Sequence, residues 1–205
     1  MTVTRETRRL STLRVAFLSL LLLALSGCGI NNIPTYEEAT DAAWSQVLNQ
    51  YQRRADLIPN LVETVKGYAA HEEEVLTAVT EARAKVNEIK VTPEMASDPA
   101  AMQMFQEAQG QLGSALSRLL VTVERYPDLK ANQNFLALQS QLEGTENRIS
   151  VARRDYIEAV RLYNTELKTI PGRWWKSLMY PESVPRANFD VAEEVKTTTP
   201  KVDFN

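Results

Sequence analysis

Few residues of this chain could take part in acid–base, nucleophilic or metal chemistry. His71 is the only histidine and Cys28 the only cysteine among 205 residues. Glutamates at positions 72–74 follow His71, and carboxylates of this kind could bind a hard cation. A zinc-protease helix needs a second histidine where Val75 stands, and a di-iron bundle needs two Glu-x-x-His motifs. The sequence therefore predicts neither a catalytic site nor a cofactor, with an enzyme or metal-binding protein that uses His71 and Glu72 as an alternative.

The setting of Cys28 predicts the attachment of lipid. Four arginines outweigh Glu6 in the first 14 residues, an apolar run covers residues 15–25, and two small residues precede Cys28. This order is typical of a secretory signal, and its end resembles the lipobox of bacterial lipoproteins. As a helix the apolar run would be roughly 16 Å long, whereas a bilayer core is about 30 Å thick. We predict a signal peptide over 1–27 and acylation of Cys28, with a buried free thiol or an uncleaved signal anchor as the alternatives.

The charge of the mature chain narrows the range of partners. The whole chain carries −3, and loss of the +3 on residues 1–27 leaves −6. Nucleic-acid binding relies on Lys and Arg that neutralise phosphates, so no nucleic-acid partner is expected. The expected anchor is membrane lipid on Cys28, followed by a tether over 28–34. The expected location is the cell envelope, facing the periplasm or the outside. In some bacteria an aspartate after the lipidated cysteine retains the protein at the inner membrane, whereas here Gly29 follows Cys28. We therefore expect the outer membrane if the source has one.

A long helix is predicted after the tether. Apolar residues recur at three- and four-residue steps from about residue 35 to residue 90, in a heptad register like that of a coiled coil. Thr35 stands three residues before Glu38, as in a capping box at a helix start. The register continues across Pro59, although a proline inside a helix costs about 3 kcal/mol. We therefore predict a helix over 35–90 that is kinked at Pro59, with a break there as the alternative.

The rest of the chain predicts two more long helices and an irregular tail. The helices are expected over 98–126, where Asp98 and Pro99 suit a helix start, and over 131–169. The predicted fold is all-α: an antiparallel up-and-down bundle over 35–170, counted as three or four helices. The tail over 171–205 contains Trp174 and Trp175, which we interpret as a cap over the open end of the bundle. An interfacial membrane foot is the alternative.

Glu72 takes an apolar place in the heptad series of the first helix. Burial of a lone carboxylate costs several kcal/mol, so a buried Glu72 would need a partner. Arg148 and Arg153, on the last helix, are the candidates. Alternatively the heptad seam has turned toward solvent at this point, as Arg83 in the companion series suggests.

A second group of candidate residues surrounds Pro59. These residues could form a partner-binding surface at a kink, or they could be structural, and we favour ordinary helix-surface charges around a structural proline. They are Arg53, Arg54, Asp56, Pro59 and Asn60.

Three ordered blocks between about residues 36 and 171 resemble the LemA family of bacterial envelope proteins. They are RRADLIPNLV at 53–62 with VKGY at 65–68 and HE at 71–72, YPDLKAN at 126–132, and TENRI, ARRDY and YNT at 145–149, 152–156 and 163–165. The resemblance implies an antiparallel helical bundle outside the cytoplasm, held at a membrane by its N-terminus. Members often have a spanning helix there, whereas this chain offers Cys28. The resemblance implies no reaction, because the family has no established biochemical activity.

These observations together favour a non-catalytic role. The expected function is that of a lipid-anchored scaffold that binds an unidentified envelope protein. Self-association into an assembly that shapes the membrane is the main alternative, and it would require apolar strips that remain exposed after the bundle closes.

Overall fold

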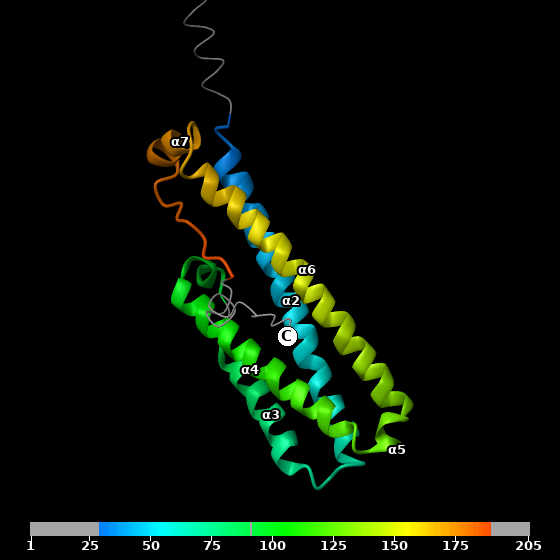
Figure 1. Ribbon diagram of the computed structural model, residues 1–205. Helices are drawn as coiled ribbons and strands as arrows, with labels where there is room; N and C mark the ends of the chain where they lie inside the picture. The colour runs from blue at the N-terminus through cyan, green and yellow to red at the C-terminus, as the bar shows by residue number, and fades with distance from the viewer. Residues whose placement is uncertain (1–28, 91, 190–205) are drawn as a thin grey trace, which may run out of the picture.

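The computed structural model describes residues 29–90 and 92–189, so the predicted signal peptide and Cys28 lie outside the described residues. Every regular element in these ranges is a helix, which confirms the predicted all-α class (Figure 1). The elements are α2 (Asn32–Lys66), α3 (Glu73–Glu88), the 3₁₀ helix η1 (Pro93–Ser97), α4 (Pro99–Val123), α5 (Pro127–Lys130), α6 (Gln133–Glu166) and α7 (Gly172–Met179).

Helix α2 begins at Asn32, ahead of the expected start at Thr35. Pro34 fits the first turn, where a backbone N–H has no partner within the helix. The Thr35 hydroxyl donates to the Asn31 carbonyl at 2.7 Å, so the predicted capping role of Thr35 is wrong. The helix then continues through Pro59 as far as Lys66. Pro59 therefore does not break it.

The chain reverses at residues 67–72, where a continuous helix to residue 90 was predicted. That prediction is wrong, because α2 and α3 are separate helices. The turn is held by backbone bonds from the Ala69 N–H to the Val65 carbonyl (2.8 Å) and from the Glu72 N–H to the Ala69 carbonyl (3.0 Å). Ala69 is buried in the core. An apolar residue inside the turn keeps the heptad pattern intact, which explains why periodicity alone concealed the reversal.

The later helices begin near the predicted positions because polar side chains cap them. Asp98 Oδ1 accepts from the N–H groups of Ala100 (2.9 Å) and Ala101 (3.3 Å) at the start of α4. Asn132 Oδ1 accepts from the Phe135 N–H at 3.0 Å at the start of α6. Each cap satisfies backbone donors that the first turn leaves free.

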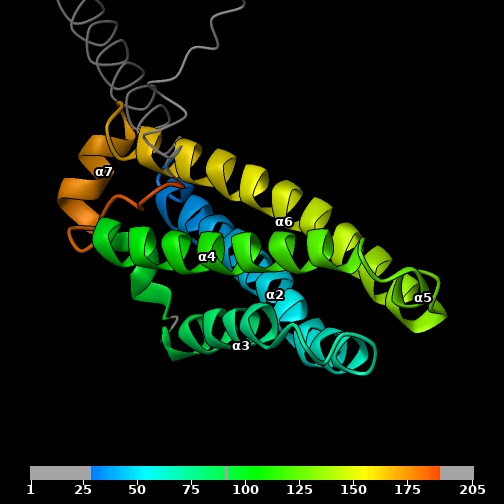
Figure 2. The ribbon, with the colours of Figure 1, turned by 60° about the horizontal axis from the view of Figure 1, so that its bottom comes forward.

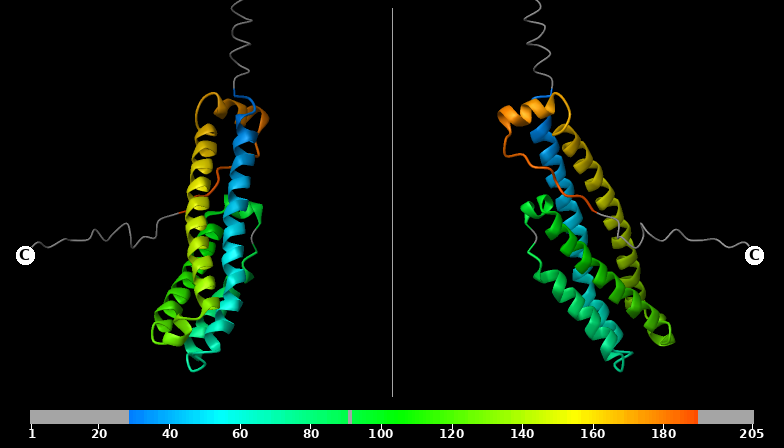
Figure 3. Two further views of the ribbon diagram at one scale, coloured as in Figure 1. Left: turned by 90° about the vertical axis from the view of Figure 1, so that its right-hand side faces the viewer. Right: turned by 60° about the vertical axis from the view of Figure 1, so that its left-hand side comes forward.

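The long helices α2 and α6 lie side by side and run in opposite directions (Figure 1). Asn32 Nδ2 donates to Glu166 Oε1 (3.2 Å) at one end, and Asn132 Nδ2 donates to the Tyr68 hydroxyl (2.8 Å) at the other. Helices α3 and α4 form a shorter pair on one side of α2 and α6 (Figure 2). This pair covers the half of the long helices that lies away from α7 (Figure 3).

The core follows this division. One cluster joins α3 and α4 to the adjacent halves of α2 and α6, and its fully buried members include Ile58, Leu61, Val65, Val79, Leu112, Leu119 and Leu129. A second, aromatic cluster lies between the other halves of α2 and α6, and it includes Trp44, Tyr51, Phe105, Tyr156 and Phe189. The two long helices therefore extend through both clusters.

The segment from 171 to 189 is more ordered than the irregular tail that was predicted. It contains α7, which lies across one end of the bundle, and a stretch without regular secondary structure over residues 181–189 that we call the strap (Figure 3). The strap runs back along the bundle toward η1, and Phe189 packs into the aromatic cluster. It therefore joins α2, α6 and the start of α4 in forming this part of the core.

Candidate functional site

The predicted lipidation site, Cys28, lies one residue before the described part of the chain. Gly29 is at the end of the bundle where α2 begins, with a positive φ of +90°. A Cβ at position 29 would be strained and would lie 3.2 Å from Asn32 Nδ2 and 3.5 Å from Pro171 Cγ. Glycine at this position is thus required by a turn that brings the chain against the start of α7.

Arg54 is buried, with 4% of its surface exposed, and it connects three helices. Its Nη1 donates to Glu146 Oε1 of α6 at 2.7 Å. Its Nη2 donates to the backbone carbonyl (3.3 Å) and to the side-chain oxygen of Gln109 in α4. The Tyr51 ring lies below the guanidinium, with 5.1 Å from Cζ to the ring centroid. The expectation that Arg54 is a helix-surface charge is therefore wrong.

The neighbouring charges do lie on the surface, as expected. Arg53, Asp56 and Asn60 are exposed. The Asp56 carboxylate accepts from Gln52 Nε2 at 2.7 Å, one turn away on the same helix. These residues do not converge on a cavity with Arg54, because Arg54 faces the interior. A partner that bound here would meet Arg53, Asp56, Pro59 and Asn60 but not Arg54.

Pro59 creates a gap in the hydrogen bonding of α2 that α3 fills. A proline has no N–H, so the Ala55 carbonyl loses its usual donor four residues later. Arg83 Nε of α3 donates to that carbonyl at 2.9 Å. Arg83 is half-buried. Its place in the heptad series thus reflects a contact between helices, and the interpretation of an outward-turned seam does not hold at this residue.

Glu72 is partnered, but by neither of the expected arginines. Its side chain is 19% exposed, and Oε1 accepts from Arg125 Nη2 (2.9 Å) and from the Tyr126 hydroxyl (2.8 Å). The hydrogen bond to the carboxylate raises the pKa of the Tyr126 hydroxyl. The predicted pairing with Arg148 or Arg153 is wrong, because Glu72 lies at the α2–α3 turn beside the end of α4, and His71 next to it is exposed.

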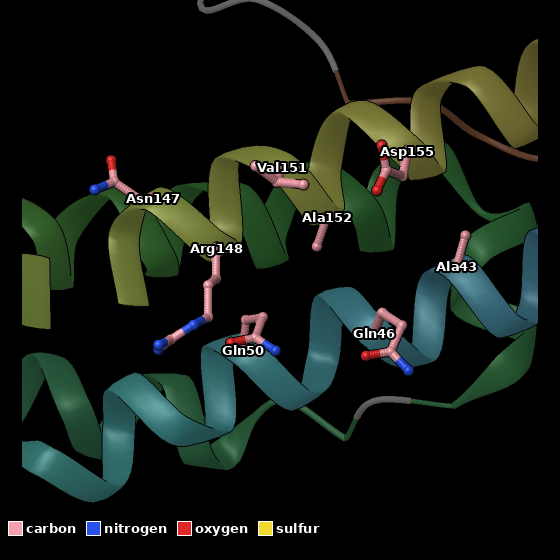
Figure 4. A pocket seen from close by; sticks show the side chains of 8 residues that line it. All are labelled: Ala43, Gln46, Gln50, Asn147, Arg148, Val151, Ala152 and Asp155. Carbon is pink, nitrogen blue, oxygen red and sulfur yellow. The ribbon is translucent and has the colours of Figure 1, made fainter. Parts of the chain in front are cut away.

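The two arginines of α6 have separate surroundings. The Arg153 guanidinium lies over the Phe189 ring, 4.4 Å from Cζ to the centroid, and so holds the end of the strap. Arg148 is exposed and reaches from α6 toward α2, where Gln46 and Gln50 lie (Figure 4). These side chains border an open groove of about 380 Å³ lined by Ala43, Gln46, Gln50, Asn147, Arg148, Val151, Ala152 and Asp155. The groove contains one arginine and one aspartate and no nucleophile–base pair.

Arg186 of the strap is a contact residue that the sequence did not predict. Its side chain is 11% exposed and lies within 3.0 Å of Asp41 and 3.3 Å of Glu37, both on α2. Its Nη1 also donates to Ser97 Oγ at 2.6 Å. Burial raises the pKa of the Asp41 carboxyl, and the Arg186 guanidinium opposes that rise. Arg186 lies in a proline-rich stretch without periodicity, so no local pattern pointed to it.

The two tail tryptophans have different surroundings. Trp175 is half-buried against the cluster of Ile33, Tyr163 and Leu167, so it is a cap of the bundle end, as predicted. Trp174 is 63% exposed and does not contribute to that cap. The prediction of a cap therefore holds for one of the two residues.

The described residues bring no metal site together. Within 29–90 and 92–189, no three His, Cys, Asp or Glu side chains lie close enough to hold a metal ion. Likewise, no helix in these ranges has the length and apolarity to span a bilayer.

Comparison with known proteins assigns the chain to a family. The profile of the LemA family matches residues 43–204, which is most of the chain. The chain belongs to the LemA family. The three blocks at 53–72, 126–132 and 145–165 all lie within the match. They include Arg54, Glu72, Tyr126 and Glu146, which form the contacts between helices described above.

Named relatives are similar over much of this chain. It is 28% identical to magnetosome protein MamQ 1 of Paramagnetospirillum magneticum over 191 residues, covering 85% of this chain and 67% of the relative. It is 26% identical to magnetosome protein MamQ of Magnetospirillum gryphiswaldense, covering 77% and 62%. It is 29% identical to protein LemA of Metamycoplasma hominis, covering 58% and 49%. The chain thus spans between about half and two thirds of these relatives' own lengths.

Proposed function

We propose that this chain is a cell-envelope lipoprotein, held to a membrane by lipid on Cys28, whose helical bundle is a non-catalytic scaffold for another envelope protein. The observation that carries the proposal is the sequence around Cys28 together with the place of Gly29. Gly29 lies at one end of the bundle, beside Pro171. An anchor on the preceding residue would leave the opposite end, at the α2–α3 turn, free to meet a partner.

The dimensions of the bundle suit this role. Helix α2 has 35 residues, which corresponds to about 52 Å at 1.5 Å per residue. A bundle of this length that is anchored at one end presents long helical surfaces to the space beside the membrane. Two relatives are named as magnetosome proteins, and these names support a role of this chain at a cellular assembly. The outer membrane is the destination we propose if the source has one, since Gly29 follows the cysteine.

The surface of α6, one of the two longest helices, gives the self-assembly alternative less support. The exposed large apolar residues of α6 are Leu136, Val151, Ile157 and Leu162, and no two of them have the three- or four-residue spacing of neighbours on a helix face. They therefore do not form the continuous strip that stacking of bundles would need.

Crosslinking in intact cells, followed by affinity capture and mass spectrometry, distinguishes the scaffold from self-assembly. We expect one dominant envelope partner, whereas crosslinks between copies alone would contradict the scaffold.

The anchor is tested by Cys28→Ser. We expect this variant to lose metabolic labelling by palmitate and to accumulate as a precursor or in the wrong compartment, because the acyl acceptor is the only thiol of the chain. Ser26→Ala is the matched control: it leaves Cys28 and a small residue before the cleavage point in place, so labelling should persist. Palmitate label that remains on the serine variant would end the lipoprotein proposal and favour an uncleaved signal anchor.

A further inference from the structure

Helix α7 lies at the end of the bundle from which the proposed anchor would extend. Pro171, which precedes α7, is one of the two residues that a side chain on Gly29 would touch, at 3.5 Å, the other being Asn32. The views agree that α7 lies across this end, next to the start of α2 and the end of α6 (Figures 1 and 3). Consecutive Cα atoms are about 3.8 Å apart, so Cys28 is within one residue of the same end. An acyl group on Cys28 would thus insert into a membrane close to α7.

The two faces of α7 differ in burial. Trp175 packs against Ile33, Tyr163 and Leu167, and so fixes the helix to the bundle. Trp174 and Leu178 are four residues apart, so they share an exposed face next to Trp175, and their exposed fractions are 63% and 76%. The packing of Trp175 holds this exposed apolar face in a set orientation.

Exposed apolar residues are frequent in the sequence in and around α7. Of twelve exposed large hydrophobic residues in the described part of the chain, five lie between residues 170 and 184: Ile170, Trp174, Leu178, Met179 and Val184. A cluster of exposed apolar side chains with a polar rim commonly marks an interaction site. Lys168 and Arg173 are exposed nearby, with Glu182 as the opposing charge. The occupant therefore has to accept an indole and aliphatic chains beside cationic groups.

We propose that the exposed face of α7 lies in the interfacial region of the bilayer that holds the anchor. The inference rests on the proposed lipidation of Cys28, since that anchor brings the membrane to this end of the bundle. Indole and aliphatic side chains next to Lys and Arg favour the headgroup–acyl boundary. A lipid tether alone leaves the bundle free to tilt. A second contact through Trp174 and Leu178 restricts that tilt and holds the long helices away from the membrane.

The test uses the full-length lipidated protein in phosphatidylethanolamine–phosphatidylglycerol vesicles that contain lipid brominated near the top of its acyl chains. Bromine quenches a tryptophan that enters the bilayer. Trp44 is 3% exposed in the core and Trp175 is half-buried, so Trp174 should give most of the quenched signal. We expect a loss of fluorescence in the wild type, and much less loss in Trp174→Phe.

A control variant moves the indole to the other end of the bundle. Val121 is 72% exposed and lies near the end of α4, away from α7 (Figure 1). The double variant W174F/V121W should float with the vesicles but remain unquenched. The inference would be overturned if wild-type protein carries lipid and floats with the vesicles while Trp174 is unquenched. The proposed lipid anchor would then still hold. Emission from Trp174 that is blue-shifted yet unquenched would indicate a second copy over the patch, and would also overturn the inference. Protein without lipid would instead overturn the proposed anchor.

Discussion

At the scale of single residues, the buried guanidinium of Arg54 shows how charge is accommodated inside this bundle. A buried ion is stable only when charge and hydrogen bonds compensate for lost hydration. Arg54 receives compensation from Glu146, from two oxygens of Gln109 and from the ring of Tyr51. Half of the Glu146 side chain is exposed, so that carboxylate keeps part of its hydration. The arrangement fixes the lateral register of α2, α4 and α6 at one level of the bundle.

Arg54→Ala should therefore be strongly destabilising. It removes the packing of the alkyl chain and leaves the side-chain oxygen of Gln109 without the Arg54 donor, a loss of about 2–4 kcal/mol in the free energy of unfolding. Arg53→Ala, one residue earlier and exposed, should cost less than about 0.5 kcal/mol. Urea unfolding of both variants measures the difference. Equal losses for the two arginines would show that Arg54 contributes as a surface charge, contrary to its burial.

At the scale of elements, a side chain of α3 replaces a backbone hydrogen bond that α2 lacks. Pro59 removes the donor for the Ala55 carbonyl, and Arg83 supplies a replacement from the neighbouring helix. The bond also fixes how far α3 can slide along α2, because the free carbonyl occurs at one level only. Pro59 and Arg83 thus form a matched pair, although they are 24 residues apart in the sequence.

A double-mutant cycle tests this pairing. Arg83→Ala should cost about 1–3 kcal/mol, since it leaves a partly buried carbonyl without a donor. In a Pro59→Ala background the same change should cost less, because the new backbone N–H at position 59 can bond to the Ala55 carbonyl within the helix. The coupling measured by denaturant unfolding should therefore be clearly different from zero. Lys85→Ala, an exposed change on α3, is the control and should show no coupling to position 59. Additive losses for Arg83 and Pro59 would contradict the pairing.

The sequence predicts the helices of this molecule better than the contacts between them. Helix periodicity and the caps at Asp98 and Asn132 are local, so the helical class and the starts of α4 and α6 could be predicted. The reversal at 67–72 could not, because a buried Ala69 continues the heptad pattern through the turn. Arg54 stands three residues after Tyr51 and four before Ile58, a core-face spacing that its charge obscured.

The partners of the candidate site residues were beyond the reach of local patterns. The sequence predicts that a buried Glu72 needs a partner, but the identity of the partners depends on the position of the α2–α3 turn relative to α4. The register of Arg148 and Arg153 on α6 relative to α2 depends on the whole assembly. The burial of the strap could not be predicted, because an irregular backbone has no periodicity that marks its buried residues.

At the scale of the whole molecule, the strap completes the bundle. The α3–α4 pair is shorter than α2 and α6, and the start of α4 reaches the aromatic cluster between their other halves through Phe105. The strap adds Phe189 to this cluster, 5.5 Å from Tyr156 and 6.0 Å from Trp44 between ring centroids. Its backbone is bonded as well: the Ala187 N–H donates to the Ala96 carbonyl at 2.6 Å, and the Tyr156 hydroxyl donates to the Ala187 carbonyl at 2.8 Å.

Asn164 of α6 binds both backbone groups of Arg186 in the strap. Its Oδ1 accepts from the Arg186 N–H and its Nδ2 donates to the Arg186 carbonyl, both at 2.9 Å. Asn164→Ala should therefore cost about 1–3 kcal/mol and open the strap locally. In native-state hydrogen exchange we expect the amides of Arg186 and Ala187 to exchange faster, while those in the middle of α3 change only by the global loss. Thr165→Ala, exposed and next to Asn164, should leave the strap amides protected. Strap amides that exchange equally in the two variants would show that the arginine and aromatic contacts hold the segment without Asn164.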